Sequence, residues 1–147
     1  MHRITARVLW AGVAATVVMT AMMMFVAPMM GVHMDIAASL AGMMHMPWIL
    51  GLAVHLMLGA IAFPILFAAQ IADRLPGNAL MKGMLFGAML WLVMEFAVMP
   101  MMGEGFLGLN GPGMMDAAAA LMAHLVYGAI LGFEATDRSV ASASQVV

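Results

Sequence analysis

Two histidines in strongly apolar surroundings are the residues best able to carry chemistry. His55 and His124 occupy the segments Leu52–Ile61 and Leu121–Ile130, which share the pattern L-x-x-H-L-x-x-G-A-I. Imidazole ligates transition metals and haem iron, and ionisable groups in apolar segments usually face the interior of a membrane protein. The matching positions predict two rings at the same depth, holding a shared ligand. The alternative is that the small neighbouring residues permit close helix packing while each ring bonds to a neighbour or a water.

Glu95 and Met23 complete the predicted inner site. Glu95 is the one acid that we expect well inside an apolar segment, and Met23 occupies the corresponding position in the first half of the chain. The carboxylate could ligate a metal, fix the tautomer of a ligating histidine or carry a proton. The inner metal site predicted from the sequence is therefore His55, His124, Glu95 and Met23. The alternatives are a protonated, locally bonded glutamate and a methionine that fills the core.

Methionine is unusually common, and half of the 22 methionines lie within two stretches, residues 29–46 and residues 99–115. Thioethers select Cu(I), whereas imidazole suits several transition metals. These methionines and nearby histidines predict an outer entry for copper, and apolar packing is the alternative. The predicted entry residues are His33, His45, Met29, Met30, Met101 and Met102.

The composition indicates that lipid surrounds these residues. The 147-residue chain is 66% hydrophobic and 8% charged, with a mean hydropathy of +1.08. Soluble domains carry roughly 25% charged residues, and a chain of this length cannot bury so much apolar surface in its own core. A net charge of −2 without a basic tract makes nucleic acid an unsuitable partner. The absence of cysteine excludes disulfides, iron–sulfur clusters and thiolate metal sites.

Four apolar segments are predicted to cross the membrane, at about residues 8–30, 47–71, 83–102 and 114–133. Each is close to the ~20 residues needed to span the hydrocarbon layer. Each must be helical, because lipid offers no partner for unpaired backbone groups. We expect the third to extend by about one turn. The fold class is thus all-α, a four-helix transmembrane bundle over residues 1–133.

The basic residues predict the orientation. All of them fall before the first segment, between the second and third, or in the polar tail at 134–147; they are Arg3, Arg7, Arg74, Lys82 and Arg138. The positive-inside rule then places both termini in the cytoplasm, across a bacterial inner membrane. The first apolar run is too long for a signal peptide, so we expect it to be retained. In the loop at 31–46, Asp35 is predicted to cap a short interfacial helix, and the loop at 103–113 is rich in turn-forming glycine.

The two halves of the chain resemble each other. Pro28–Gly31 and Pro100–Gly103 both read PMMG, and in each half this motif precedes the histidine segment. We therefore predict tandem repeats at 8–71 and 83–133, related by a pseudo-two-fold axis along the membrane normal. Short loops favour an up-down bundle with the second and fourth helices on one diagonal.

The four short hydrophobic helices, the paired PMMG ends and the histidine–glycine helices resemble a family of small four-helix bacterial membrane proteins of unknown function. The resemblance covers most of the chain. It implies the fold and no activity.

Three functions are compatible with these features. No nucleophile elbow, phosphate loop or zinc-protease helix is present, so we do not expect an enzyme. The first hypothesis is a protein that binds a transition metal, copper being favoured, between its helices and handles it at the outer face. The second is a cofactor-free accessory or scaffold subunit of a larger membrane complex or homo-oligomer. The third is a b-type haem protein with His55 and His124 as axial ligands, although no basic residue is predicted outside to meet the haem propionates.

Overall fold

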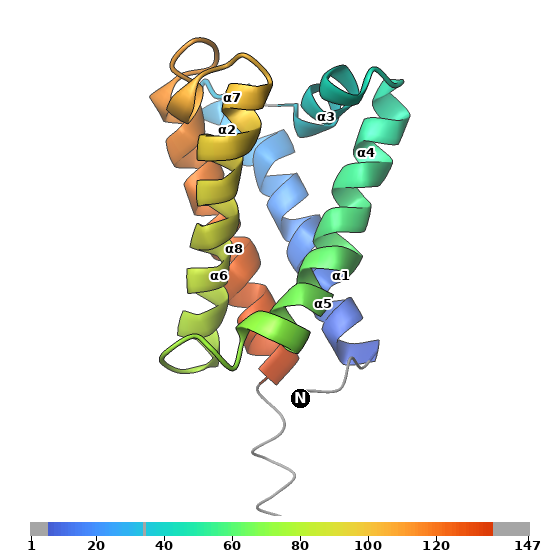
Figure 1. Cartoon of the computed structure of the whole chain (residues 1–147), viewed down its shortest axis with the longest axis vertical. Coiled ribbons are helices and arrows are strands. Elements are labelled where there is room, and N and C mark those ends of the chain that lie inside the picture. Colours follow the sequence, from blue (N-terminus) through green and yellow to red (C-terminus); the bar gives the residue numbers. More distant parts are fainter. Residues whose placement is uncertain (1–5, 34, 137–147) are drawn as a thin grey trace, which may run out of the picture.

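The computed structural model describes residues 6–33 and 35–136, and this part of the chain forms helices without a strand. Four of its helices are long and apolar enough to cross a membrane (Figure 1). We call them the first to fourth spans: Ala6–Met29, Trp48–Ile71, Ala79–Met101 and Met114–Ala135. The predicted all-helical fold, with four helices long and apolar enough to cross a membrane, is confirmed.

Three of the spans change helical type along their length. The first is α1 (Ala6–Ala21), η1 (Met22–Val26) and α2 (Ala27–Met29). The second is α4 (Trp48–Met57), η2 (Leu58–Ala62), α5 (Phe63–Leu66) and η3 (Phe67–Ile71), and the third is α6 (Ala79–Val93), η4 (Met94–Val98) and α7 (Met99–Met101). Segments η1 to η4 are π-helical, whereas the fourth span is one regular helix, α8 (Met114–Thr136).

Prolines account for three of the π-helical segments. Pro28, Pro64 and Pro100 each follow such a segment by two residues. The N–H of the residue before each proline bonds to the carbonyl five residues back: Ala27 to Met22, Phe63 to Leu58 and Met99 to Met94. Because proline has no N–H, the next carbonyl in each span lacks its helical donor; these carbonyls belong to Met23, Gly59 and Glu95.

The two PMMG motifs adopt the same local structure. At the end of the first and third spans, the motif closes with a glycine of positive φ, +77° at Gly31 and +83° at Gly103. The following N–H then reaches back to the residue before the proline, from Val32 to Ala27 at 3.1 Å and from Glu104 to Met99 at 3.0 Å. The second and fourth spans differ, since only the second is interrupted by π-helical segments. Superposition of the complete halves stays a prediction.

Glycines set the order of neighbouring spans. Gly83 and Gly87 of α6 lie against the backbone of His124, Gly128 and Gly132 of α8, with no room for a side chain between them. On its other side α8 packs against α1, and α1 packs against η2. The second and third spans meet mainly through η3 and α6, and farther along they diverge (Figure 1). The bundle is therefore up-down, but open between its second and third spans.

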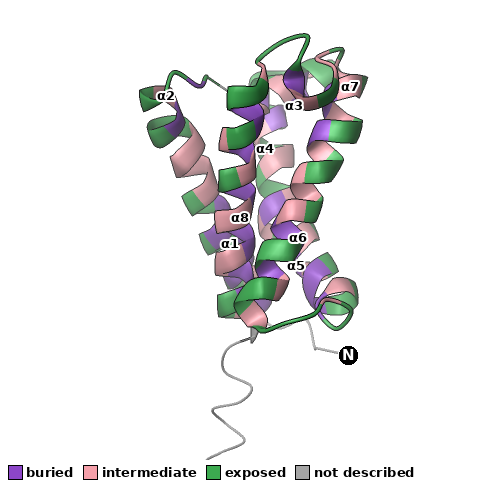
Figure 2. Cartoon of the chain, turned by 90° about the vertical axis from the view of Figure 1, so that its left-hand side faces the viewer, coloured by how far each residue is buried: buried purple, intermediate pink, exposed green. Residues whose placement is uncertain are grey.

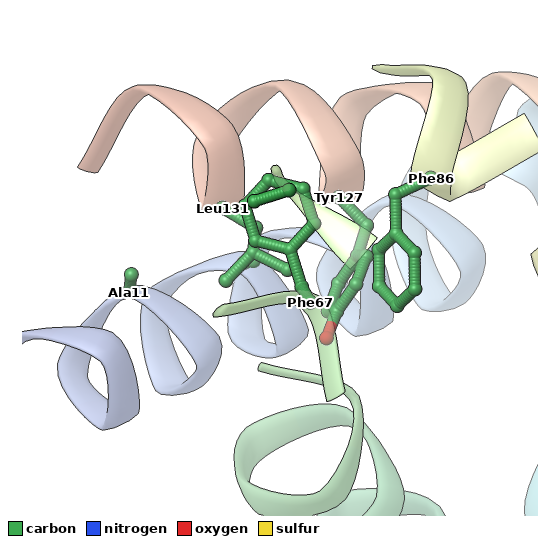
Figure 3. Close-up of a cluster of buried hydrophobic side chains, with 7 residues drawn as sticks. Ala11, Phe67, Phe86, Tyr127 and Leu131 are labelled. Atoms are coloured by element: carbon green, nitrogen blue, oxygen red, sulfur yellow. The ribbon is translucent and has the colours of Figure 1, made fainter. Parts of the chain in front are cut away.

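The hydrophobic core lies in the half of the bundle nearer the N-terminus. Phe67 of η3 and Phe86 of α6 have ring centroids 5.2 Å apart, and Tyr127 and Leu131 of α8 pack beside them (Figure 3). This contact closes the second span onto the third at that end. The opposite end, which carries α3 (Ile36–Met44) and the loop at 102–113, is called the α3 end below.

One cap predicted from the sequence and one further cap are present. Asp35 accepts the N–H of Ala38 at 2.9 Å and begins α3, as expected from the sequence. The same carboxylate accepts the indole N–H of Trp48 at 2.9 Å, which ties α3 to α4. Asn78 caps α6 through the N–H of Met81, and the third span starts earlier than the predicted residue 83, which confirms the extra turn.

The polar tail was predicted to start at residue 134, but α8 continues through Thr136. The reason is that Glu134 and Ala135 extend the helix by favourable propensity. Residues 137–147, with Arg138, and Arg3 lie outside the described residues.

The four spans differ in how much of their surface is buried. Exposed and half-buried residues run along the spans from one end to the other (Figure 2). The fourth span is the most buried, at 44% of its apolar window, compared with 17% for the second. The fourth span is thus the centre of the bundle, and the apolar outer faces suit a lipid surrounding.

Replacing Gly83 with Ala tests the glycine contact. Its Cβ would meet the carbonyl oxygen of Gly128, so we expect a loss of about 1–3 kcal/mol of stability. Gly42→Ala in α3 is the matched control, because its Cβ meets nothing within 4 Å; it should be neutral or stabilise by up to about 1 kcal/mol. Thermal unfolding in detergent measures both, and equal midpoints for the two variants would contradict the packing.

Candidate ligand-binding site

A cavity of about 350 Å³ occupies the α3 half of the bundle, and we call it the central cavity. All four spans contribute to its wall, together with the residues that lead into α3. Its imidazole, hydroxyl and thioether groups come from His33, His55, His124, Thr20, Met19, Met23, Met24 and Met94. The only carboxylate in this wall is that of Asp35, which already caps α3.

Two further cavities adjoin it. A deep cavity of about 170 Å³ shares His55, His124 and Met94 with the central cavity and continues toward the core as far as Tyr127. A loop cavity of about 190 Å³ lies at the α3 end and shares His33, Asp35 and Met94 with the central cavity. All three cavities share Ile36 and Met94 in their walls. The aromatic core lies beyond the deep cavity, whose wall includes Tyr127.

The two predicted histidines line the same cavities, as the matching segments suggested. His124 is 8% exposed, and its Nδ1 lies 2.7 Å from the carbonyl oxygen of Ala120 one turn earlier. A carbonyl can only accept, so Nδ1 carries the proton and donates it. The lone pair of His124 is therefore on Nε2, which has no partner among the described residues and is free to bind a ligand.

His55 is held differently. Its Nε2 lies 3.2 Å from the hydroxyl oxygen of Thr20 in the first span. The hydroxyl can donate to or accept from this nitrogen, so the bond is compatible with either tautomer. When Thr20 accepts, the lone pair of His55 is on Nδ1. Thr20 is thus the residue that orients His55, and sequence analysis missed it.

Sequence analysis also missed most of the thioethers in the wall. Met23 was predicted, whereas Met19, Met24 and Met94 were not. Their spacing held the signal, because residues 19, 20, 23 and 24 share one face of a helix through i+4 pairs. That face contains both the thioethers and the hydroxyl that meets His55.

Glu95 is not brought to the histidines. It lines none of the three cavities, it is 0% exposed, and neither of its carboxyl oxygens has a hydrogen-bond partner. Within residues 6–33 and 35–136, no three His, Cys, Asp or Glu side chains converge as a metal site would require. The predicted set of His55, His124 and Glu95 is therefore not assembled. The reason is that neighbouring residues of a helix point about 100° apart, and in the third span Met94 faces the cavity while Glu95 does not.

The predicted outer residues divide into two groups. His33 and Met102 line the loop cavity. The others are exposed and line none of the three cavities, namely His45, Met29, Met30 and Met101. Met29 and Met101 occupy matching positions in the two PMMG motifs and are 86% and 76% exposed.

The floor of the deep cavity is a polar contact across the bundle diagonal. The hydroxyl of Tyr127 in the fourth span donates to the carbonyl of Gly59 in the second span at 2.7 Å. Gly59 is the residue whose carbonyl lost its helical donor to Pro64. Its missing side chain also admits Thr16, whose hydroxyl would meet a Cβ at 2.5 Å. One glycine therefore joins three spans.

Four spans that are long and apolar enough to cross a membrane, arranged around a cavity with histidine and thioether walls, define a small helical protein with an internal cavity. Residues 2–143 match the family of unknown function DUF6789, and the chain belongs to this family. No curated protein and no solved structure is detectably similar to it.

Removing the Tyr127 hydroxyl tests the diagonal contact. Tyr127→Phe should cost about 1–3 kcal/mol, because it leaves the buried Gly59 carbonyl without a partner. Pro64→Ala supplies a new N–H five residues after Gly59. In that background Tyr127→Phe should cost less, and a double-mutant cycle of unfolding free energies measures the difference. Additive effects of the two substitutions would show that the proline does not leave this carbonyl free.

Proposed function

We propose that this protein binds Cu(I) between its membrane-spanning helices and handles the ion at the outer face of the membrane. The observation that carries the proposal is that three imidazoles, two of them from the paired segments around His55 and His124, line one cavity together with four thioethers. The imidazole ligands of the proposed Cu(I) site are His55 and His124. Its thioether ligands come from the methionines of the first and third spans that line the central cavity.

The ligand types favour copper over other metals. Zinc sites typically need three or four nitrogen, oxygen or thiolate ligands, and no such cluster occurs in the described part of the chain. Soft thioethers select Cu(I), and imidazole completes a mixed site. The bond from His124 Nδ1 to Ala120 supports this function, because a ligating imidazole usually donates its other N–H to a carbonyl or carboxylate.

The proposal includes the orientation in a bacterial inner membrane. Arg7 and Lys82 lie near the N-terminal ends of α1 and α6, and Arg74 follows the C-terminal end of η3, all at the closed end of the bundle. The positive-inside rule assigns this end to the cytoplasm. The α3 end, with its open cavities, then faces the outside.

Two other functions give distinct outcomes. A bis-histidine b-type haem would bind between His55 and His124 and give a Soret band in the purified protein. A cofactor-free accessory subunit would be colourless and free of metal, and the opening between the second and third spans supports this alternative, since another helix could fill it.

Substituting the histidines tests the metal site. His55→Ala and His124→Ala should weaken Cu(I) binding by more than roughly 10–100-fold, which is the loss typical of substituting a group that only hydrogen-bonds to a metal ligand. His45→Ala, an exposed histidine outside the cavities, should bind as wild type. Metal analysis and competition with a Cu(I) chelator in detergent measure these affinities, and wild-type copper content in both cavity variants would exclude the site.

Glu95→Gln distinguishes the metal site that the cavity supports from the site predicted from the sequence, which included Glu95. We expect nearly wild-type affinity, because Glu95 does not line the cavity. A loss of about 10–100-fold would instead indicate that the carboxylate hydrogen-bonds to a ligating histidine.

Acidifying the medium should release the ion from the wild-type protein, since a protonated imidazole cannot ligate a metal.

A reporter fused after Val147 tests the orientation. We expect an enzyme that is active only in the cytoplasm to work at this position, because the positive-inside rule assigns the arginine- and lysine-containing parts of the sequence, the tail among them, to that side. A reporter active only in the periplasm would reverse the assignment of the α3 end.

A further inference from the structure

We infer that the loop cavity is a second, transient Cu(I) site, through which the ion reaches the histidine pair. The inference rests on the proposed function and deepens it, because it assigns the route and the residues of entry.

Side chains shared by two cavities support this route of entry. His33, Asp35 and Met94 belong to the walls of both the loop cavity and the central cavity. The two volumes therefore meet at these side chains. Since the Phe67–Phe86 contact closes the bundle at the other end, an ion that enters through the loop cavity passes these shared side chains before it reaches His55 and His124.

The donor set of the loop cavity suits a soft cation. Met99 and Met102, at the end of the third span, supply thioethers, and His33 supplies an imidazole from the loop after the first span. These are the same ligand types as in the central cavity, so an ion can pass between sites of similar chemistry. Fewer donors are available here, as expected for a site that passes its ion inward.

Charge adds a second argument. Asp35 and Glu104 also line the loop cavity, whereas Arg7, Arg74 and Lys82, the basic residues in the described part of the chain, lie toward the opposite end. Asp35 is oriented by its bonds to Ala38 and Trp48. Two carboxylates without a nearby cation raise the local concentration of positive ions. They attract the ion, and the thioethers select it.

Adjacent methionines provide a matched test. Met102 lines the loop cavity, whereas Met101 is 76% exposed and lines none of the three cavities. His33 lines both the loop cavity and the central cavity, whereas His45 lines none of the three. Met102→Leu and His33→Ala should therefore slow loading, while Met101→Leu and His45→Ala should not.

The experiment is stopped-flow transfer of Cu(I) from a weak chelator to the full chain in detergent. In Met102→Leu and His33→Ala we expect the rate of transfer to fall by about tenfold, the scale on which an entrance that concentrates ions changes on-rates. The stoichiometry and equilibrium affinity of the histidine pair should stay as in wild type for Met102→Leu, whose side chain lies outside the central cavity.

Each outcome is decisive. Equal loading rates in Met102→Leu and Met101→Leu would overturn the transient site and leave the proposed function intact. A loss of copper stoichiometry in Met102→Leu would also overturn it, because Met102 would then belong to the main site. Wild-type protein that takes up no Cu(I) would overturn both proposals.

Discussion

Three prolines within the spans impose the constraint on which the cavity depends. Pro28, Pro64 and Pro100 each remove one N–H from a helix that has no water to replace it. The chain responds with a π-helical segment before each proline, which shifts the following face of the helix. The missing N–H of Pro64 also leaves the carbonyl of Gly59 free to accept the Tyr127 hydroxyl, at the floor of the deep cavity.

Close glycine contacts make the bundle asymmetric. The backbones of α6 and α8 approach without intervening side chains, and the Phe67–Phe86 contact then pulls the second span toward the third at one end. No equivalent contact joins α4 to the third span near the α3 end. The α3 half is therefore held open while the other half is filled. An opening on one side of a sealed core is the arrangement expected when a ligand enters from one face of the membrane.

Glu95 is the least explained residue of the structure. A fully buried carboxyl group without a hydrogen-bond partner destabilises a fold, and such a group inside a membrane span usually has a function. Its place in the second half of the chain corresponds to Met23 in the first, which lines the central cavity. The two halves therefore share their proline motifs and differ at this position, so the site cannot be symmetric even if the halves superpose.

The sequence by itself determined the four spans, the Asp35 cap of α3 and the glycine ends of the PMMG motifs. Each of these follows from local rules, because lipid requires paired backbone groups and only glycine adopts positive φ at low cost. The sequence also singled out His55 and His124, which line one cavity. Only the tertiary structure decided that Met102 lines a cavity while Met101 is exposed, and that Glu95 is separated from the histidines. The reason is that helical periodicity says which residues share a face, whereas the π-helical shifts and the glycine contacts decide which face meets a neighbour.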